Sequence, residues 1–128
     1  MPNSFLIVAN WKMNGSRSLA AELLASLKLK HHTWPKLKLL ICPPNLYLET
    51  AHNTLHGTSL SVGAQDLWFG SAPATGNTSA DMLKDIGANF VIIGHSERRQ
   101  LNLESDLVIT SKLNAAIEHD LVPILCVG

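Results

Sequence analysis

The sequence predicts an α/β protein in which parallel strands alternate with helices. Five short apolar runs recur along the 128 residues, and most of them are near-continuous in Val, Ile and Leu. Such runs are typical of strands that are buried on both faces, as in a parallel sheet. Helical patterns lie between them, and the length suits a single domain over residues 1–128. The runs cover residues 5–9, 37–42, 60–63, 90–93 and 121–127.

The first three helices are predicted from an apolar face, a proline pair or a capping residue. Ser16 is placed to cap the first helix, whose apolar residues follow the spacing i, i+4, i+5, i+8. A proline pair follows the second run directly and opens a helix over residues 45–55. Thr78 or Ser79 caps a third helix, which has an acidic residue in its first turn. The apolar face of the first helix consists of Leu19, Leu23, Leu24 and Leu27.

A fourth main helix follows the fourth run after a short helical turn. The turn begins at Ser96, and Ser105 caps the longer helix behind it. The alternation implies right-handed crossovers and a parallel sheet, which is either an open doubly wound sheet or part of a (β/α)8 barrel. The sequence contains neither Gly-x-Gly-x-x-Gly nor a Walker-type loop, which excludes the common dinucleotide and P-loop sites. The face of the longer helix is interpreted as Leu107, Lys112, Leu113, Ala116 and Ile117.

Composition and charge exclude several classes of partner. Ten Lys and Arg residues balance ten Asp and Glu residues, so no basic field favours nucleic acid or an anionic membrane. The longest apolar run, residues 5–9, is far too short to span a membrane, and the start, residues 1–5, lacks the basic region and cleavage site of a signal peptide. Cys42 and Cys126 form neither a disulfide framework nor a metal-site spacing. We therefore expect a soluble cytoplasmic protein without a metal site, in which both thiols are buried and inert.

Polar residues gather where the first strand ends. Asn10 and Lys12 are two positions apart, so a continuing strand would project both from one face. In parallel α/β folds, ligands bind at the carboxyl ends of the strands. An amide beside an ammonium suits an anionic, oxygen-rich ligand such as a sugar phosphate. The alternative is that Lys12 is a solvated lysine that follows a strand.

A second polar group follows the fourth strand. His95 falls at the strand end, just before the helical turn that starts at Ser96. The positive end of a helix dipole disfavours an imidazolium, so we expect a neutral ring that can donate its N–H to a carbonyl oxygen. The alternative is that His95 is a structural cap, with Arg98 and Arg99 as a surface pair. The other histidines lie on predicted helices or at their ends and are interpreted as surface residues.

Together the two groups resemble the signatures of the triosephosphate isomerases. The matching hexapeptides are Asn-Trp-Lys-Met-Asn-Gly at residues 10–15 and Gly-His-Ser-Glu-Arg-Arg at residues 94–99. Other segments resemble the family in chain order over nearly the whole chain. The resemblance implies a (β/α)8 TIM barrel, of which this chain supplies about the first half, with five strands and four main helices. The other segments cover residues 62–65, 74–76, 81–87 and 122–128.

The resemblance also implies an activity and a set of site residues. Triosephosphate isomerases interconvert dihydroxyacetone phosphate and glyceraldehyde 3-phosphate through an enediolate, without a metal or cofactor, in glycolysis and gluconeogenesis. His95 matches the family's neutral electrophile, a role already known for these enzymes. Lys12 matches the cation that meets the substrate's negative charge. Asn10 matches a substrate-binding amide, and Glu97 matches the carboxylate that orients Lys12.

The loop after the third strand carries the expected dimer contact. The resemblance implies that the loop over residues 65–79 reaches into a partner subunit through Thr75, which gives a homodimer. Where the family continues with Thr-Gly-Glu, this chain has Thr75-Gly76-Asn77. The family glutamate pairs with the arginine that matches Arg98. We therefore expect that charge pair to be reduced to a hydrogen bond at best.

The family chain is about twice as long as this one, since a (β/α)8 barrel takes about 250 residues. Its general-base glutamate, lid and phosphate-binding loops follow the fifth strand. We therefore expect a half-site that is inactive alone, with exposed apolar edges at the first and fifth strands. The chain is then a fragment of a longer product, a truncated chain or a half-barrel that pairs with a second copy. The alternative function is a non-catalytic half-barrel that self-associates and at most binds phosphate weakly.

Overall fold

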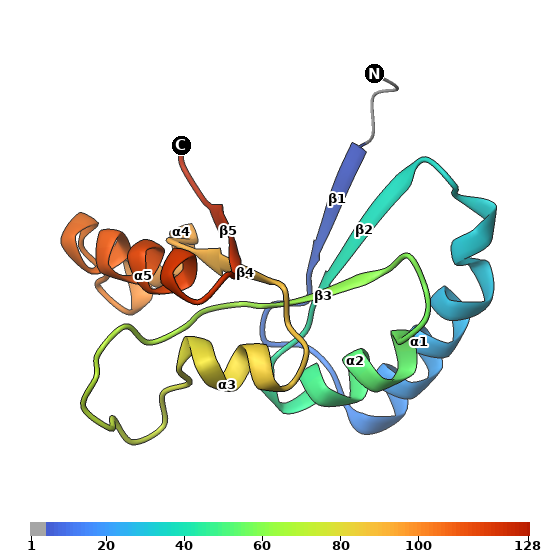
Figure 1. Cartoon of the computed structure of the whole chain (residues 1–128), viewed down its shortest axis with the longest axis horizontal. Coiled ribbons are helices and arrows are strands. Elements are labelled where there is room, and N and C mark those ends of the chain that lie inside the picture. The colour runs from blue at the N-terminus through green and yellow to red at the C-terminus, as the bar shows by residue number, and fades with distance from the viewer. Residues whose placement is uncertain (1–4) are drawn as a thin grey trace.

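The computed structural model describes residues 5–128 and contains one sheet of five parallel strands in chain order, β1-β2-β3-β4-β5. The sheet is curled, and helices lie along one of its faces (Figure 1). The predicted parallel sheet is therefore confirmed. The expectation about a leader concerns residues 1–5, of which residues 1–4 lie outside the described residues. The strands are β1 (Phe5–Asn10), β2 (Leu37–Cys42), β3 (Ser61–Ala64), β4 (Phe90–Ile93) and β5 (Val122–Leu125).

The helices begin where the sequence predicts them, because their caps are local. The hydroxyl oxygens of Ser16, Ser79 and Ser105 each accept a backbone N–H three residues further on. This satisfies a donor that the first turn of a helix leaves free. The helix after the proline pair starts as a 3-10 turn, Asn45–Tyr47, before it becomes α-helical. The α-helices are α1 (Arg17–Lys30), α2 (Leu48–Leu55), α3 (Ala80–Asp85), α4 (Ser96–Leu101) and α5 (Asp106–Glu118); a further 3-10 turn covers His31–Thr33.

The core has two parts because strand side chains alternate between the faces of the sheet. On the helical face, residues such as Ile41, Val91 and Ile93 pack against apolar residues of the helices. On the opposite face, Leu40 and Ile92 are buried together in a smaller cluster. The carboxyl-terminal halves of β2, β3 and β4 are thus covered on both sides, as the continuous apolar runs predict.

The predicted apolar faces of two helices are partly wrong. In α1, Leu24 is fully buried, but Leu19 and Leu23 remain 47% and 39% exposed. In α5, Leu107 and Ile117 are exposed. In each helix the buried residues form a narrow strip, which contains alanines. The strip residues are Ala20 and Leu24 in α1, and Ile109, Lys112, Ala115 and Ala116 in α5.

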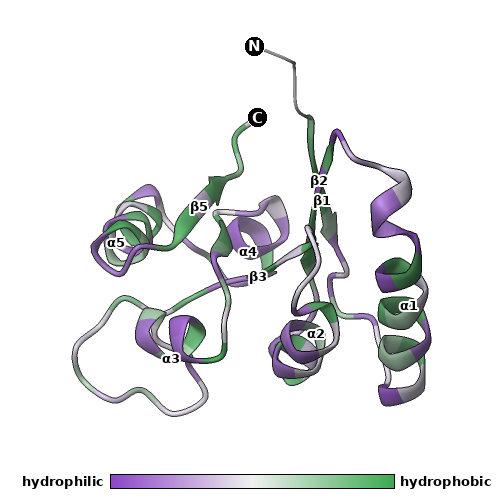
Figure 2. Ribbon diagram, turned by 45° about the vertical axis from the view of Figure 1, so that its right-hand side comes forward, coloured by the Kyte–Doolittle hydropathy of each residue, from purple (hydrophilic) through white to green (hydrophobic). Residues whose placement is uncertain are grey.

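The outer strands are the least covered part of the sheet, as predicted. Phe5 and Ile7 on β1 are 71% and 51% exposed, and Val122 and Leu125 on β5 are 49% and 43% exposed. Figure 2 shows both strands as hydrophobic ribbons at the two ends of the sheet. Among the described residues, no helix is both long and apolar enough to cross a membrane. Exposed apolar residues also lie in turns and in helices away from the edge strands, such as Met13, Leu46 and Met82.

Candidate active site

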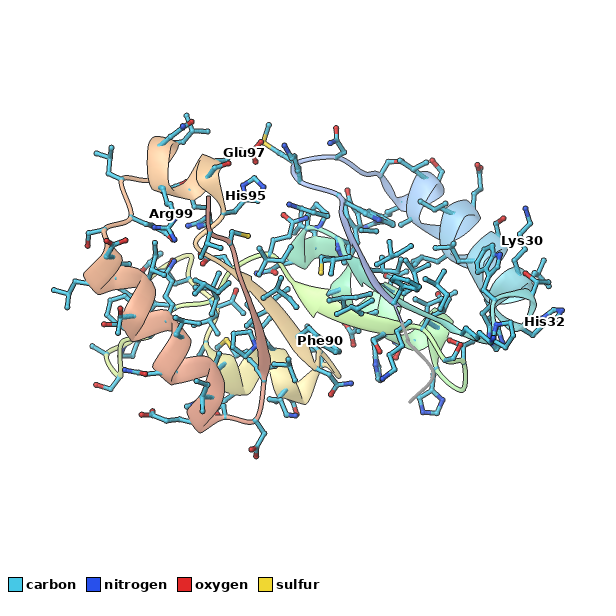
Figure 3. All side chains as sticks on the ribbon, turned by 90° about the horizontal axis from the view of Figure 1, so that it is seen from above. Lys30, His32, Phe90, His95, Glu97 and Arg99 are labelled. Atoms are coloured by element: carbon cyan, nitrogen blue, oxygen red, sulfur yellow. The ribbon has the colours of Figure 1, made fainter. Side chains whose placement is uncertain are left out.

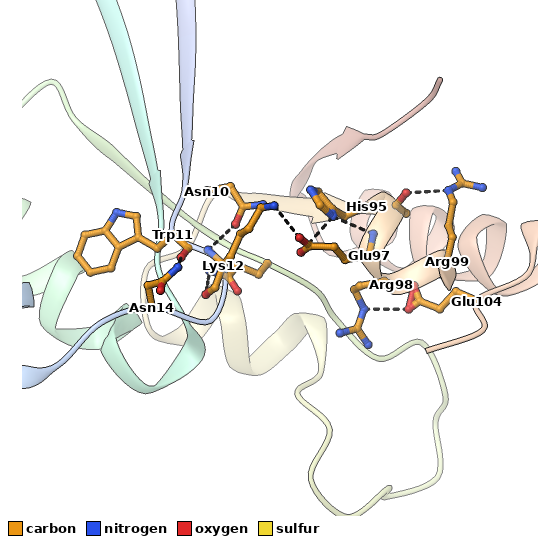
Figure 4. Close-up of polar contacts among 11 residues, drawn as sticks. Asn10, Trp11, Lys12, Asn14, His95, Glu97, Arg98, Arg99 and Glu104 are labelled. Carbon is orange, nitrogen blue, oxygen red and sulfur yellow. Dashed lines mark hydrogen bonds and ion pairs between the residues drawn. The ribbon is translucent and has the colours of Figure 1, made fainter. Parts of the chain in front are cut away.

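The first side of the site is a strained turn directly after β1. Lys12 has a positive φ of 55°, in the left-handed region that side chains with a Cβ rarely adopt. Its backbone N–H donates to Asn10 Oδ1 at 2.8 Å, and the chain bends there. The strand ends at Asn10, so strand alternation does not place Lys12, contrary to our expectation. The turn brings the two residues together instead (Figure 4).

Gln65 holds this turn from the end of β3. Its side-chain amide Nε2 donates to the carbonyl oxygens of Lys12 and Cys42, both at 2.9 Å. One amide group therefore joins the ends of three neighbouring strands. The sequence pattern did not predict this role, although a polar residue directly after a buried strand is a signal that could have indicated it.

The second side of the site is the start of α4. His95 caps this helix, because its Nδ1 accepts the backbone N–H of Glu97 at 3.2 Å. An accepting Nδ1 carries no proton, so a neutral ring has its proton on Nε2. The same Nδ1 lies 3.6 Å from Glu97 Oε2, which is a contact with a neutral ring in this arrangement and not an ion pair. The ring is thus both a cap and a potential N–H donor.

Lys12 and Glu97 join the two sides of the site. Lys12 Nζ donates to Glu97 Oε1 at 2.6 Å across a separation of 85 positions in the sequence. Both side chains are about half exposed, at 50% and 46%. The hydrogen bond from Lys12 and its positive charge hold the pKa of Glu97 below its ordinary value. Figures 3 and 4 show Glu97 beside His95, so the structure brings Asn10, Lys12, His95 and Glu97 to one end of the sheet.

Two hollows are lined by residues of the site. One, of about 320 Å3, is lined by Lys12, Gln65, Asn77 and Arg98 among others. The other, of about 590 Å3, is lined by His95 and residues near the end of β5. Lys12 and His95 therefore face different hollows, with Glu97 between them. An anionic ligand that contacts both would lie across the pair.

Arg98 belongs to a partly buried group of four charges. Its Nε donates to Glu104 Oε2, and its Nη2 forms an ion pair with Asp66 Oδ2, both at 2.9 Å. Lys112, only 2% exposed, contacts the same two carboxylates at 2.7 and 2.9 Å. The charge pairs of Arg98 thus come from Asp66 and Glu104 and do not depend on the residue at position 77. The idea that Arg98 and Arg99 form a surface pair is wrong.

The other predicted polar residues lie away from this pair. Cys42 is buried, and burial raises the pKa of its thiol to about 12, which keeps it unreactive. Cys126 is only partly buried, so the expectation of two buried thiols holds for one of them. His32 lies across the molecule from His95 (Figure 3), and Thr75 is exposed on its loop. Within residues 5–128, no group of three His, Cys, Asp or Glu side chains could hold a metal ion.

Comparison with known proteins accounts for this arrangement. A family model described as triosephosphate isomerase matches residues 5–128. The chain belongs to the triosephosphate isomerase family. It is 44% identical over 124 residues to the triosephosphate isomerase of Klebsiella pneumoniae, a match that covers 96% of this chain and 49% of that protein. The triosephosphate isomerase of Salmonella paratyphi B is 43% identical over 124 residues, and this match also covers 96% of this chain and 49% of that protein.

A solved structure gives the same picture of the fold. The triosephosphate isomerase of Bartonella henselae superposes with a TM-score of 0.85 and is 40% identical, and the match covers 96% of this chain and 51% of that one. The chain thus spans about half the length of the triosephosphate isomerases that it matches. Its five curled strands correspond to the N-terminal half of the barrel, which confirms the predicted fold.

Proposed function

We propose that this chain supplies the electrophilic half of a triosephosphate isomerase site. The observation that carries the proposal is the 2.6 Å contact between Lys12 and Glu97 beside the His95 ring, at the carboxyl end of the sheet. The substrates are dihydroxyacetone phosphate and glyceraldehyde 3-phosphate, and the reaction is a proton transfer between neighbouring carbons through an enediolate. With this activity the protein would act in glycolysis and gluconeogenesis, in the cytoplasm.

Each side chain has a role that follows from its chemistry. Lys12 attracts the negative charge of the substrate, and Glu97 holds the ammonium in place. A bare contact at about 4 Å and an effective dielectric near 20 is worth about 4 kcal/mol, which solvent reduces because Lys12 is half exposed. His95 donates its Nε2–H to the substrate oxygen that gains charge as the enediolate forms. Asn10 holds the turn that presents Lys12.

The carbon-bound proton requires a base that this half-site does not offer. Glu97 is the carboxylate at the site, but Lys12 lowers its pKa, and a weak base cannot remove that proton efficiently. In our proposal the base comes from residues outside 1–128, as the family resemblance implies. The 128-residue chain alone is then inactive, although it binds the substrate.

The loop over residues 65–79 is our candidate for a homodimer contact. Thr75 is exposed near the tip of this loop, where it is free to meet a second subunit. Asp66, at the base of the loop, pairs with Arg98 of α4. Through that ion pair, a partner bound to the loop would also affect the position of α4, which begins directly after His95.

The test is binding and turnover measured together. Dihydroxyacetone phosphate added to the 15N-labelled chain should shift the signals of Lys12 and His95, and Lys12→Ala should weaken binding about 10- to 100-fold. The parent 128-residue chain should turn over glyceraldehyde 3-phosphate no faster than its Lys12→Ala variant does. In a longer chain that continues the family fold, Lys12→Ala and His95→Gln should each abolish turnover, whereas His52→Ala should not. Equal binding by Lys12→Ala and the parent would overturn the proposal.

A second candidate function rests on the exposed edge strands. Unpaired, apolar strands are templates for association with another chain. In this alternative the chain is a non-catalytic half-barrel that self-associates through β1 and β5. Sedimentation velocity on two variants separates the two modes of association. Ile7→Lys would dissociate an edge-to-edge assembly, whereas Thr75→Arg would dissociate a dimer formed through the loop.

A further inference from the structure

The side chain of Arg99 joins three segments behind the His95 ring. Its Nε donates to the carbonyl oxygen of Gly94 at 2.7 Å, and its Nη2 donates to the carbonyl oxygen of Cys126 at 3.0 Å. Its Nη1 contacts Asp106 Oδ1 at 3.0 Å, at the start of α5. One guanidinium therefore links the ends of β4 and β5 to the next helix. Figure 4 shows the first of these bonds next to His95.

The backbone at Gly94 is shaped to receive this guanidinium. Gly94 has a φ of +72°, a conformation that favours glycine. A Cβ at this position would lie 2.9 Å from Arg99 Nη2 and 3.3 Å from Ile109. The turn that leads into His95 is thus closed against Arg99, and a side chain larger than hydrogen would displace the guanidinium.

Arg99 also holds the other side of the histidine. Its backbone N–H donates to the carbonyl oxygen of His95 at 3.1 Å. The same residue therefore fixes the peptide before His95 through its side chain and the peptide after it through its main chain. The bond from the Glu97 N–H to the ring, at 3.2 Å, is at the long end for a hydrogen bond. A small shift of the His95 backbone would break it.

We propose that Arg99 is a positioning residue that fixes the His95 ring and its tautomer. The hydrogen bonds from Arg99 to the carbonyl oxygens of Gly94 and Cys126 support this role, since both acceptors lie at the ends of strands. The ion pair with Asp106 contributes little, because that carboxylate is 97% exposed. The inference deepens the proposed function, because it concerns the ring that would donate to the substrate. It does not require that the chain binds a substrate.

The experiment is 15N NMR of the histidine side chains in the 128-residue chain without ligand, near neutral pH. In the parent, His95 should show an unprotonated Nδ1 and a protonated Nε2. Arg99→Lys and Arg99→Gln should move both nitrogen signals toward the average of the two tautomers. Asp106→Asn is the matched control and should leave them in place. The five other histidines report whether the fold is intact; they are His31, His32, His52, His56 and His119.

Three results would overturn the inference. One is an unchanged His95 signal in Arg99→Lys. Another is an equal change in Asp106→Asn, which would assign the effect to the exposed ion pair. The third is loss of signal dispersion for all histidines in Arg99→Lys, since that result makes Arg99 a general requirement for the fold. A chain that binds no triose phosphate but shows the expected His95 change would refute the proposed function alone.

Discussion

Replacing Lys112 by methionine tests the buried charge group most directly. Methionine keeps most of the length and apolar volume of the lysine stem but removes its charge. Lys112 is 2% exposed, and its ammonium contacts Asp66 and Glu104, which are 24% and 5% exposed. The substitution leaves two carboxylates with Arg98 as their cation. Removing one partner from a buried ion pair costs about 3–5 kcal/mol, and we expect that loss in the free energy of unfolding at pH 7.

The pH dependence of the free energy of unfolding is a second test of the role of Lys112. Burial raises the pKa of Glu104, but the hydrogen bonds and charges of Lys112 and Arg98 lower it more. Its stabilising contribution is therefore complete above the ordinary value of 4.5 and is lost as the pH falls through the lower folded value. Burial raises the pKa of Asp66, against the effect of Lys112 and Arg98. Without Lys112, both carboxyl pKa values rise, so protonation relieves the destabilisation as the pH falls.

Urea unfolding of the parent and of Lys112→Met, at pH 7 and at pH 5, measures both effects. The difference between the two proteins should shrink at the lower pH. Lys28→Met is the matched control, because Lys28 is exposed on α1, and it should change stability by less than about 0.5 kcal/mol. A loss below about 1 kcal/mol at pH 7, or a loss independent of pH, would refute the assigned role of the charge group.

Three further predictions concern the core, the thiols and one turn. Leu24→Ala should cost about 2–5 kcal/mol in urea unfolding because Leu24 is fully buried, whereas Leu29→Ala, 74% exposed on the same helix, should cost under about 0.5 kcal/mol. Peptide mapping after iodoacetamide treatment at pH 8 should find Cys126 modified and Cys42 intact; equal labelling would contradict the burial described here. Gly87→Ala should lower stability by at least about 1–2 kcal/mol, because φ is +90° and a Cβ would overlap a histidine ring of α2; a neutral effect in thermal unfolding would contradict this.

Features set by a few neighbouring residues could be predicted from the sequence. The caps at Ser16 and Ser105 depend on a hydroxyl and a backbone N–H three positions away. The limits of β2 and β4 follow from apolar runs that end at a proline or a glycine. The site residues at the ends of β1 and β4 were found because parallel strands bring their carboxyl ends to one edge.

Features that depend on distant partners could not be predicted. The sequence spacing places Lys112 on an apolar helix face, but it does not show that Asp66, 46 positions away, accepts a hydrogen bond from its ammonium. Arg98 keeps its charge pairs despite Asn77, since Glu104 and Asp66 lie within reach. The number of leucines on a helix face likewise does not say how many of them are buried, as Leu19 and Leu23 show.

The order of the strands has a consequence for how the chain is built. Each of the strands β2 to β5 pairs with the strand that precedes it in the chain. A strand can therefore join the sheet as soon as it has been synthesised. Paired residues of successive strands still lie far apart in the sequence, as Phe5 and Leu37 do, so each new strand must close a long loop before it pairs. A chain emerging from the ribosome, amino end first, can add one strand and one helix at a time to a growing sheet. At every stage the growing sheet has two unpaired edges, β1 and the newest strand, and both are open to pairing with another chain.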